Sequence, residues 1–423
     1  MSTTRAITLS ADLLAAVLQG PGAADAIMER FFRAHKALGG RERGQIAEIT
    51  YGCLRHYRRL TAIAADTAPV ALVGAYLATV EGLSARALAA LGLRGMDDLV
   101  VAARRQSQWP WPVTTSLPDW LADQLTQTFG TDEAQALARA WLESAPLDIR
   151  CNSIRGDRAS LAERLRAEQQ ELEPTPYSPW GLRRPSRAPL FRTEAFREGR
   201  FEVQDEASQL IAPLLEVRRG ERVVDFCAGA GGKTLHIGAL MGNGGTLYAF
   251  DTSVKRLDRM KARIARAGLD NVRIQVISGH HDQKVKRLHG KIDRVLVDAP
   301  CSGTGTLRRS PDIKWRITPA AVARLAGEAL AILTAAAQLV RPGGRLVYAT
   351  CSVLAAENED VVCAFLRACP EFVPLDTPAI LKRRGIPLPD AAERALKLLP
   401  HRHGTDGFFA QAFDRTAVAS QRP

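Results

Sequence analysis

The sequence predicts an α/β protein with a doubly wound parallel sheet, preceded by a small α/β unit and an all-helical region. From about residue 200 onward, short apolar runs alternate with helical patterns, as in stacked βαβ units. Residues 1 to about 140 are rich in Ala and Leu and lack strand alternation. Many prolines punctuate the stretch between these two parts. We therefore expect three parts: 1–140, 141–200 and 201–423, and 423 residues suffice for three cores.

The composition is that of a folded protein with an excess of positive charge. Hydrophobic residues make up 46% and charged residues 24%, which argues against a disordered, collagenous or coiled-coil chain. The chain has 57 Lys and Arg against 45 Asp and Glu, a net charge of +12. Such a balance favours a polyanionic partner, although a generally basic proteome would give the same number.

No membrane-spanning segment is expected. The uncharged apolar stretch Thr67–Val80 is too short to cross a bilayer and contains Pro69. The helical run Ala320–Val340 is interrupted by Arg324 and Glu328. The first residues carry a single Arg before an apolar segment that an Asp soon breaks, so no secretory signal is expected either.

The cysteines predict a reduced, cytoplasmic compartment. Their number is odd and no two form a C-x-x-C pair, which disfavours a disulfide framework, a zinc site or a thioredoxin-like site. No metal is expected. Most of the thiols should be free, so a conspicuous one is a candidate for chemistry. The seven are Cys53, Cys151, Cys227, Cys301, Cys351, Cys363 and Cys369.

The N-terminal region contains an amphipathic, basic helical pattern. One predicted buried face comprises Ile46, Ile49, Cys53, Tyr57 and Leu60. Three arginines, Arg55, Arg58 and Arg59, fall largely off it. Other basic residues nearby are Arg30, Arg33, Lys36, Arg41 and Arg43. Together they predict either a phosphate-binding surface or simply a solvated face.

The rest of the chain reads as strands and crossovers. An alternating segment at Leu147 and a polar helical stretch through Glu171 predict the small α/β unit, followed by an irregular, Pro-rich connector. A long helix, Ala320–Val340, fits a crossover between the last two strands. The predicted strands of the sheet are Arg222–Phe226, Thr246–Asp251, Arg273–Ser278, Asp293–Asp298 and Arg345–Thr350.

A glycine-rich turn follows the first of these strands. It reads Cys-Ala-Gly-Ala-Gly-Gly-Lys-Thr from Cys227, and such a turn can bring backbone N–H groups and a helix start against a ligand. A Walker A loop would need Gly at Cys227, and G-x-G-x-x-G would need Gly at Thr234. The loop is therefore typical of nucleotide binding without being a phosphate loop.

Two carboxylates follow the next two strands. Asp251, 19 residues after Gly232, is placed to reach the hydroxyls of a ribose; its alternative role is to cap a helix with Thr252 and Ser253. Asp282 could touch an adenine amino group, or belong to a solvated turn.

The fourth and fifth strands each end beside a cysteine. Cys301 follows Asp298-Ala-Pro, and Cys351 follows Thr350. The carboxyl ends of parallel strands form the ligand-binding edge of such sheets. An isolated Cys is usually a small core residue, but two at this edge favour nucleophiles.

With these motifs the sequence resembles the RsmB/Nop2/Sun family of S-adenosylmethionine-dependent RNA cytosine-C5 methyltransferases. The resemblance covers about 145–415 and implies a class I methyltransferase domain preceded by a small RRM-like unit. The segment 41–60 is similar to a NusB-like helical RNA-binding domain of the RsmB branch. The matching motifs begin at Phe201, Cys227, Asp251, Asp298, Thr350, Glu357 and Leu399.

The resemblance implies a role for each site residue. Cys351 is the nucleophile that adds to C6 of cytosine, Asp298 holds or supplies a proton near N3, and Cys301 assists release. Lys233 orients the acidic groups, contacts RNA, or is merely a helix-start lysine. The residues implied to bind S-adenosylmethionine are Cys227, Ala228, Gly229, Ala230, Gly231, Gly232, Lys233, Asp251, Arg256, Asp282 and Asp298. One departure is Ala230, where many members have Pro.

A cytosine stacked in a helix is inaccessible, so the target must be single-stranded or flipped out. Trp315 is either a stacking surface for RNA or, as we expect, packed under its own loop. The cations expected to hold the RNA backbone are Arg308, Arg309, Lys314 and Arg316.

The sequence thus predicts an RNA cytosine-C5 methyltransferase, with 16S ribosomal RNA as the expected substrate because of the NusB-like segment. A tRNA methyltransferase of the same family is the first alternative. The second is a non-catalytic RNA-binding or ribosome-assembly factor, against which the presence of both cysteines argues.

Overall fold

The computed structural model describes residues 4–93, 99, 109–185, 188–388 and 394–416. These residues form two compact units. The first comprises 1–144 together with 306–318, and the second comprises 145–305 and 319–423. The division into three parts, with a NusB-like first part, stays a prediction.

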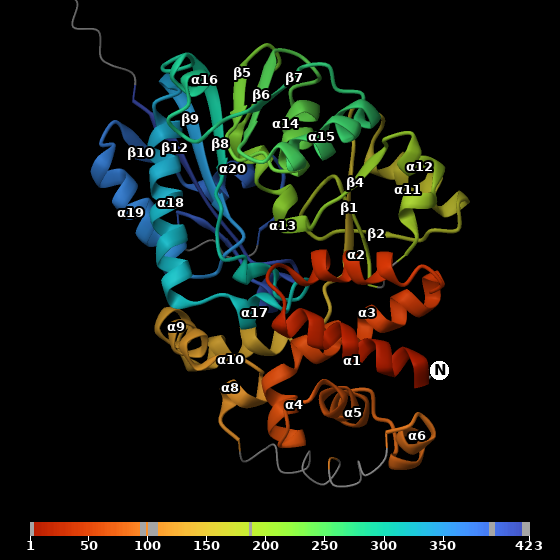
Figure 1. Ribbon diagram of the computed structural model, residues 1–423. Coiled ribbons are helices and arrows are strands. Elements are labelled where there is room, and N and C mark those ends of the chain that lie inside the picture. Colours follow the sequence, from red (N-terminus) through yellow and green to blue (C-terminus); the bar gives the residue numbers. More distant parts are fainter. Residues whose placement is uncertain (1–3, 94–98, 100–108, 186–187, 389–393, 417–423) are drawn as a thin grey trace, which may run out of the picture. The chain divides into compact units, whose positions relative to one another are not determined.

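The first unit is helical, as predicted (Figure 1). Its core is formed by apolar side chains repeating along α1, α3, α4 and α5, among them Leu14, Ile46 and Leu72. Its elements are α1 (Thr4–Gln19), α2 (Ala24–Ala34), α3 (Gly40–Arg55), α4 (Tyr57–Ala64), α5 (Pro69–Thr79), α6 (Ala85–Ala90), α8 (Trp111–Thr114), α9 (Asp119–Phe129), α10 (Thr131–Ala140) and α17 (Ile313–Arg316).

The buried face predicted around Ile46 is confirmed, but it lies on two helices. The backbone leaves the helical conformation at His56, between α3 and α4. Ile46, Ile49, Cys53 and Leu60 are buried, and Tyr57 is half-buried. The prediction was wrong for Arg55, which is buried and donates to the carbonyl oxygen of Arg308.

The segment 306–318 belongs to the helical unit although it directly follows the Cys301 loop in sequence. The Lys314 side chain is only 1% exposed, and its ammonium donates to the carbonyl oxygens of Arg55 and Ser116 at 2.8 and 2.9 Å. Arg308 is also buried. These two cations therefore cannot hold an RNA backbone as the sequence predicted, because their charged groups are taken up inside the unit.

Trp315 is packed, as expected, but against α3 and α4 instead of under its own loop. Its indole N–H donates to the Leu54 carbonyl oxygen at 2.7 Å, and its ring meets that of Tyr57 edge-on at 5.1 Å. Asp312 accepts a hydrogen bond from the Ala24 backbone N–H at 3.1 Å. The segment 306–318 is thus an integral part of the helical unit.

The second unit begins with a small antiparallel sheet of strand order β2-β3-β1-β4. Alternate residues of its strands, such as Ile149, Leu182 and Phe201, bury one face against α11. The elements are β1 (Leu147–Cys151), α11 (Arg158–Ala167), β2 (Glu173–Pro174), β3 (Gly181–Arg184), η2 (Leu190–Arg192), α12 (Glu194–Arg197) and β4 (Phe201–Val203).

The main sheet has the order β10-β12-β9-β8-β5-β6-β7, with β11 paired to β12. Strands β5 to β9 run parallel, and β12 runs antiparallel to β9. The strands are β5 (Arg222–Asp225), β6 (Thr246–Asp251), β7 (Val272–Val276), β8 (Ile292–Asp298), β9 (Val340–Thr350), β10 (Phe372–Pro374), β11 (Leu396–Leu398) and β12 (Phe408–Arg415).

Helices cover both faces of this sheet, so the predicted doubly wound α/β class is confirmed. On β5, Val223 faces the cluster that contains α14 and α20, while Val224 faces the cluster that contains α18 and α19. The remaining described helical elements are α13 (Glu206–Gln209), η3 (Ala212–Leu215), α14 (Gly232–Leu240), α15 (Val254–Ala267), α16 (Gln283–Lys286), η4 (Thr304–Thr306), α18 (Pro319–Ala337), η5 (Ala355–Glu357), α19 (Glu359–Ala368), α20 (Thr377–Arg383) and α21 (Pro400–His403).

Among the described residues, α18 is the one helix long and apolar enough to cross a membrane by length and composition. The pair α4 and α5 passes the same test together but is bent by 98°. A single such helix is weak evidence for a span, because core helices have the same composition. Here Ala329, Leu333 and Ala336 of α18 pack in the core of the sheet.

The packing of Trp315 predicts a stability effect in the helical unit. Trp315→Ala should destabilise α3 and α4 by about 2 kcal/mol, which is about thirtyfold faster hydrogen exchange of their amides. Trp315→Phe is the matched control, since it keeps a ring against Tyr57 and loses only the indole donor. It should cost about 1 kcal/mol. Unchanged hydrogen exchange in the Ala variant would contradict this packing and indicate that the Trp315 side chain faces the solvent.

Candidate active site

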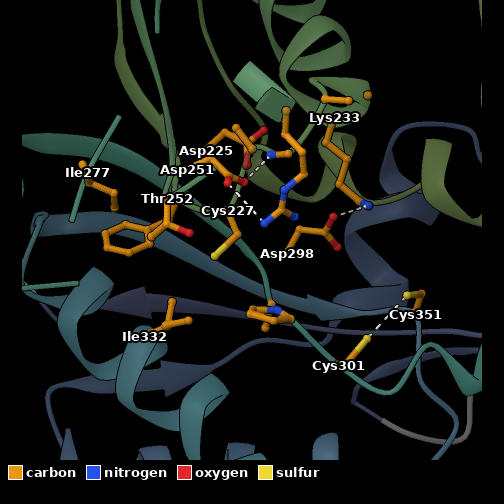
Figure 2. Close-up of a pocket in the computed structure, with 18 of the residues that line it drawn as sticks. Asp225, Cys227, Lys233, Asp251, Thr252, Ile277, Asp298, Cys301, Ile332 and Cys351 are labelled. Carbon is orange, nitrogen blue, oxygen red and sulfur yellow. Dashed lines mark hydrogen bonds and ion pairs between the residues drawn. The ribbon is translucent and has the colours of Figure 1, made fainter. Parts of the chain in front are cut away.

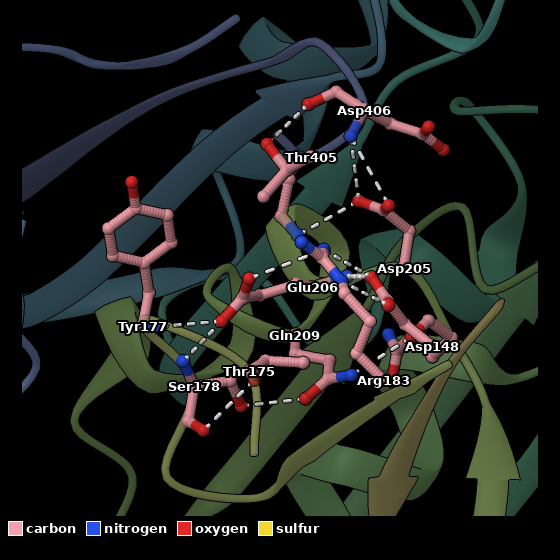
Figure 3. Close-up of polar contacts among 12 residues, drawn as sticks. Asp148, Thr175, Tyr177, Ser178, Arg183, Asp205, Glu206, Gln209, Thr405 and Asp406 are labelled. Carbon is pink, nitrogen blue, oxygen red and sulfur yellow. Dashed lines mark hydrogen bonds and ion pairs between the residues drawn. The ribbon is translucent and has the colours of Figure 1, made fainter. Parts of the chain in front are cut away.

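Acidic and thiol side chains gather where the parallel strands end. Asp225, Asp251 and Asp298 are the last residues of β5, β6 and β8. Cys301 lies three residues beyond β8, and Cys351 directly follows β9. Because β9, β8, β5 and β6 are consecutive in the sheet, these ends are neighbours, and all five residues line a cavity of about 520 Å³ (Figure 2).

The glycine-rich turn forms one wall of this cavity. Of the predicted loop residues 227–233, all except Gly231 line it. Gly231 has φ +91°, and a Cβ atom there would lie 2.5 Å from Cγ of Met260. Only glycine fits both the conformation and the space, so this residue allows the loop to close onto α15 and the helix α14 to begin at Gly232.

Asp251 is held by the backbone of this loop. Its side chain is only 4% exposed, and its Oδ2 accepts a hydrogen bond from the Gly229 N–H at 2.8 Å. Its Oδ1 accepts from the Ser253 N–H at 2.7 Å and lies 3.3 Å from the guanidinium of exposed Arg256. The helix cap that was the alternative role is supplied by Ser253, whose hydroxyl accepts from the Arg256 N–H. The carboxylate is therefore fixed at the cavity wall.

The structure does not bring Asp282 into this group. Its carboxylate accepts from the backbone N–H groups of Ser278 and Lys284, both at 2.8 Å, and so caps the short helix α16. These hydrogen bonds hold the pKa of Asp282 below its ordinary value. The cavity is lined near this turn by Ile277, Gly279 and His280 instead.

Asp225 is a buried acid with an unusual environment. One oxygen accepts from the Thr234 hydroxyl at 2.7 Å, while Oδ1 is buried without a hydrogen-bond partner. Burial raises the pKa of Asp225 to about 7, with the Asp298 charge adding to the rise and the Thr234 hydrogen bond opposing it. At neutral pH this carboxyl is therefore poised between its two charge states.

Lys233 forms an ion pair with one of the acids, Asp298. Its ammonium lies 2.7 Å from Oδ2 of Asp298 and 4.9 Å from the centre of the Phe408 ring. Burial would lower the pKa of Lys233, but the charge of Asp298 and its hydrogen bond outweigh burial and raise that pKa. The electrostatic interaction with Cys351 adds to the rise of the Lys233 pKa. Lys233 is thus not a surface lysine: it is a charged group at the floor of the cavity.

The two cysteines lie side by side. Their sulfur atoms are 3.4 Å apart, and both thiols are free, as are the other five (Figure 2). The hydrogen bond with Cys351 and burial raise the pKa of Cys301 well above its ordinary value, so Cys301 keeps its proton at neutral pH. Backbone bonds fix the pair, since the Gly305 N–H donates to the Cys351 carbonyl oxygen at 2.9 Å.

A buried carboxylate ties the Cys301 loop down. Glu357 accepts from the Ser302 N–H and hydroxyl, both at 2.6 Å. The hydroxyls of Thr304 and Ser352 join the two cysteine loops at 3.1 Å. Each cysteine is therefore flanked by a serine held in a common polar network, and the spacing of the sulfur atoms is built in.

Cys227 lines the same cavity but is chemically different. Burial and the charges of Asp225, Asp298 and Asp251 raise its pKa well above the ordinary value. A thiol in such an acidic surrounding keeps its proton and is a poor nucleophile.

Several lining residues were not assigned a role from the sequence. Gln204 and Ser208 come from the segment between the two sheets, and Glu328 and Ile332 come from α18. Phe408 begins β12. Gln204 and Phe408 lie in motifs shared with the family, so the sequence could have pointed to them as site residues. Glu328 carried none, because on the sequence it is an ordinary charge on a helix.

In the part of the chain that the structure describes, no three His, Cys, Asp or Glu side chains gather as metal ligands.

Two models of known protein families match this chain. The family model described as 16S rRNA methyltransferase RsmB/F matches 212–414. A second model, an RsmF/B-like ferredoxin-like domain, matches 117–189 and thus covers the strands of the small sheet up to β3.

Curated relatives agree with both models. The chain is 35% identical over 296 residues to a probable ribosomal RNA small subunit methyltransferase B of Bacillus subtilis. That match covers 70% of this chain but 65% of the relative, slightly less than two thirds. To the ribosomal RNA small subunit methyltransferase B of Pseudomonas syringae it is 32% identical over 405 residues, covering 87% of this chain and 88% of the relative.

Solved structures share the fold. A protein described as PH0851 has a TM-score of 0.79 at 24% identity, covering 98% of this chain and 99% of its own. NSun6 from Pyrococcus horikoshii, solved with SFG, has a TM-score of 0.63 at 23% identity, covering 70% of this chain and 98% of its own. The class I methyltransferase fold that the sequence predicts is thereby confirmed, and the chain belongs to the RsmB/F methyltransferases of the RsmB/Nop2/Sun family.

Proposed function

We propose that this protein transfers a methyl group from S-adenosylmethionine to C5 of a cytosine in 16S ribosomal RNA. The observation that carries the proposal is the pair of free thiols, 3.4 Å apart, at the rim of the acidic cavity. A methyltransferase that acts on oxygen or nitrogen needs no thiol. Cytosine C5 is a weak nucleophile, so a thiolate must first add to the neighbouring C6.

The cavity fits the cofactor on three grounds. S-adenosylmethionine supplies an electrophilic methyl group on a sulfonium cation. Asp225 and Asp298 would provide the negative surroundings for that cation, and the unpartnered Oδ1 of Asp225 awaits a donor or a positive charge. Asp251 would accept hydrogen bonds from the ribose hydroxyls beside the N–H groups of the glycine loop. SFG, seen with the relative NSun6, is an analogue of this cofactor.

Cys351 is assigned the addition step. Its thiolate forms a bond to C6, and the electron pair of the C5–C6 double bond moves onto C5, where it is delocalised through C4 onto N3. Asp298 would hold a proton near N3 and so stabilise that charge. The positive charge of Lys233 interacts electrostatically with Cys351. The ion pair between Lys233 and Asp298 holds the Asp298 carboxylate in position.

Cys301 is assigned the release step. Once C5 carries the methyl group, its proton must leave to a base, after which the Cys351–C6 bond breaks and the C5–C6 double bond returns. Cys301, with its sulfur in contact with that of Cys351, is placed where this bond breaks. Its raised pKa keeps the Cys301 thiol protonated, so it does not compete with Cys351 as a nucleophile.

The substrate assignment is supported by the relatives, which are named ribosomal RNA small subunit methyltransferase B. The net charge of +12 suits a nucleic-acid partner. Exposed cations of α2, α3 and the turn between them, including Arg30, Arg33, Lys36 and Arg41, offer phosphate contacts in the helical unit. The cytoplasm is the compartment that fits such a substrate.

Single replacements of the two cysteines test the mechanism. With labelled S-adenosylmethionine and 16S rRNA transcribed in vitro, Cys351→Ala should lower methyl transfer more than about a thousandfold. Cys301→Ala should instead accumulate a protein–RNA adduct, seen as a nuclease-sensitive band on a denaturing gel. Bulk tRNA in a parallel assay is the control for the alternative substrate. Normal turnover by Cys351→Ala, or labelling of tRNA alone, would contradict the proposal.

Asp251 and Asp282 form a matched pair for the cofactor site. Asp251→Ala removes an acceptor at the cavity wall, so calorimetry should show affinity for S-adenosylmethionine reduced about tenfold to a hundredfold. Asp282→Ala removes a cap outside the cavity and should change affinity less than about threefold. Equal losses in both variants would show that the carboxylate at 251 has no special role.

The buried Asp225 predicts a pH dependence of stability. Its pKa is about 7 in the folded protein and 3.8 ordinarily, so the folded state holds a proton that the unfolded state has lost. This stabilisation is complete below pH 4 and disappears as the pH rises through 7, a change of about 2–3 kcal/mol between pH 5 and 8. Asp225→Asn should lack it. Urea unfolding of both proteins without cofactor measures the difference, and a gap that is the same at pH 5 and pH 8 would refute the assignment.

A further inference from the structure

A second cavity, of about 420 Å³, lies at the opposite edge of the main sheet, where the parallel strands begin. Its wall includes Arg294, near the start of β8, and Arg345 of β9. Arg345 precedes Cys351 by six residues, which at 3.3 Å per residue of strand is about 20 Å. The cavity is therefore remote from the methyl-transfer site, and neither the cofactor nor the target cytosine can occupy it. We call it the arginine cavity.

The inner arginines of this cavity are already neutralised. Arg345 has an 8% exposed side chain, pairs with Glu216, and pairs with Asp414 at 2.8 Å. Arg294 pairs with Glu221 at 3.2 Å. Both acidic residues of the wall, Glu216 and Asp414, are thus engaged by a buried guanidinium. With their charge offset in this way, Glu216 and Asp414 no longer repel an anion strongly.

The rim carries the unneutralised charge. Arg218 and Arg384 belong to the lining and are exposed, and three further exposed cations lie within four residues of them in sequence: Arg219, Arg222 and Lys382. Within the described residues none of these five side chains has an ion pair. The Arg222 backbone N–H donates at 2.8 Å to Asp293, which directly precedes Arg294 in β8. The cavity therefore has a buried, paired interior and an unpaired cationic rim, which two separate segments of the chain supply.

The chemistry of this rim matches a phosphodiester backbone. Guanidinium groups bind phosphate oxygens in a bidentate fashion, and several of them spaced around a cavity suit a chain of phosphates better than a single anion. An acidic protein surface would also be attracted. RNA is favoured because the same chain presents its catalytic edge to RNA, and a long ribosomal RNA can reach a surface about 20 Å away.

We propose that the arginine cavity and its rim bind phosphates of the ribosomal RNA substrate at a place remote from the target cytosine. This inference rests on the proposed function, because it takes RNA as the ligand. It assigns part of the substrate affinity to the amino edge of the sheet, where no reacting atom lies. Binding of the long RNA should therefore depend on residues that the chemistry never touches.

The test uses the full chain and the double variant Arg218→Gln with Arg384→Gln. Binding of 16S rRNA transcribed in vitro is measured by filter binding at several salt concentrations. Loss of two phosphate contacts should weaken binding about tenfold at 0.1 M salt and reduce the slope of log affinity against log salt by about two. Arg166→Gln with Arg367→Gln removes two exposed charges elsewhere in the same unit and should leave the slope within about half a unit.

Folding and the ligand class are checked in parallel. Affinity for S-adenosylmethionine by calorimetry should equal that of the wild type in both double variants, showing that the domain is intact. An unchanged RNA slope in Arg218→Gln with Arg384→Gln would overturn the inference, and so would a loss confined to poly-glutamate binding, which would assign the rim to an acidic protein. If the wild-type chain fails to bind 16S rRNA at all, the proposed function itself is contradicted, a result distinct from either outcome.

Discussion

The site depends on the parallel pairing of β8 with β9, which sets the Cys301 loop against the end of the next strand. Asp298 at the end of β8 pairs with Ala349 near the end of β9, so the two strands leave the sheet at the same place. The loops then stay joined, because the Gly305 N–H donates to the Cys351 carbonyl oxygen. A Cβ at Gly305 would lie 2.0 Å from the Gly407 carbonyl oxygen, so this approach requires glycine. The contact between the Cys301 and Cys351 sulfur atoms follows from that junction.

Charge is distributed with a consistent logic over the second unit. The carboxyl edge of the sheet concentrates Asp225, Asp251 and Asp298 around one buried lysine, an environment suited to a cationic ligand. The amino edge concentrates arginines, whose inner members are paired and whose outer members are exposed. A net charge of +12 alone could not show this separation, because composition does not report position.

The fold was largely predictable because local signals and tertiary packing agree. Thr246–Asp251 is a strand with the predicted bounds, and the other four predicted strands are found with shifted ends. The largest shift is in β9, which begins at Val340 because the Pro-Gly-Gly turn is absorbed into the strand as an irregularity opposite β8. Strand β12 was not predicted, since its buried apolar run has no alternation to reveal it.

Side-chain placement was predictable only where it follows from strand ends. Asp251, Cys301 and Cys351 lie at the cavity because each is at or just beyond the end of a strand. Asp282 does not reach the cavity, because its carboxylate accepts hydrogen bonds from the backbone of its own short turn. The basic run after Cys301 misled for a different reason. Lys314 is buried in the helical unit, and nothing in its sequence neighbourhood distinguishes a cation held by backbone carbonyls from one facing RNA.

The most direct measurement of the central claim is the site of covalent attachment. RNA containing 5-fluorocytosine cannot lose the C5 substituent as a proton, so an enzyme that uses a thiol adduct becomes trapped on it. Mass spectrometry of the digested complex, with fragmentation to locate the modified residue, should find the nucleotide on Cys351 and an unmodified Cys301. A nucleotide on Cys301, or no adduct on either cysteine although the RNA is bound, would contradict the account.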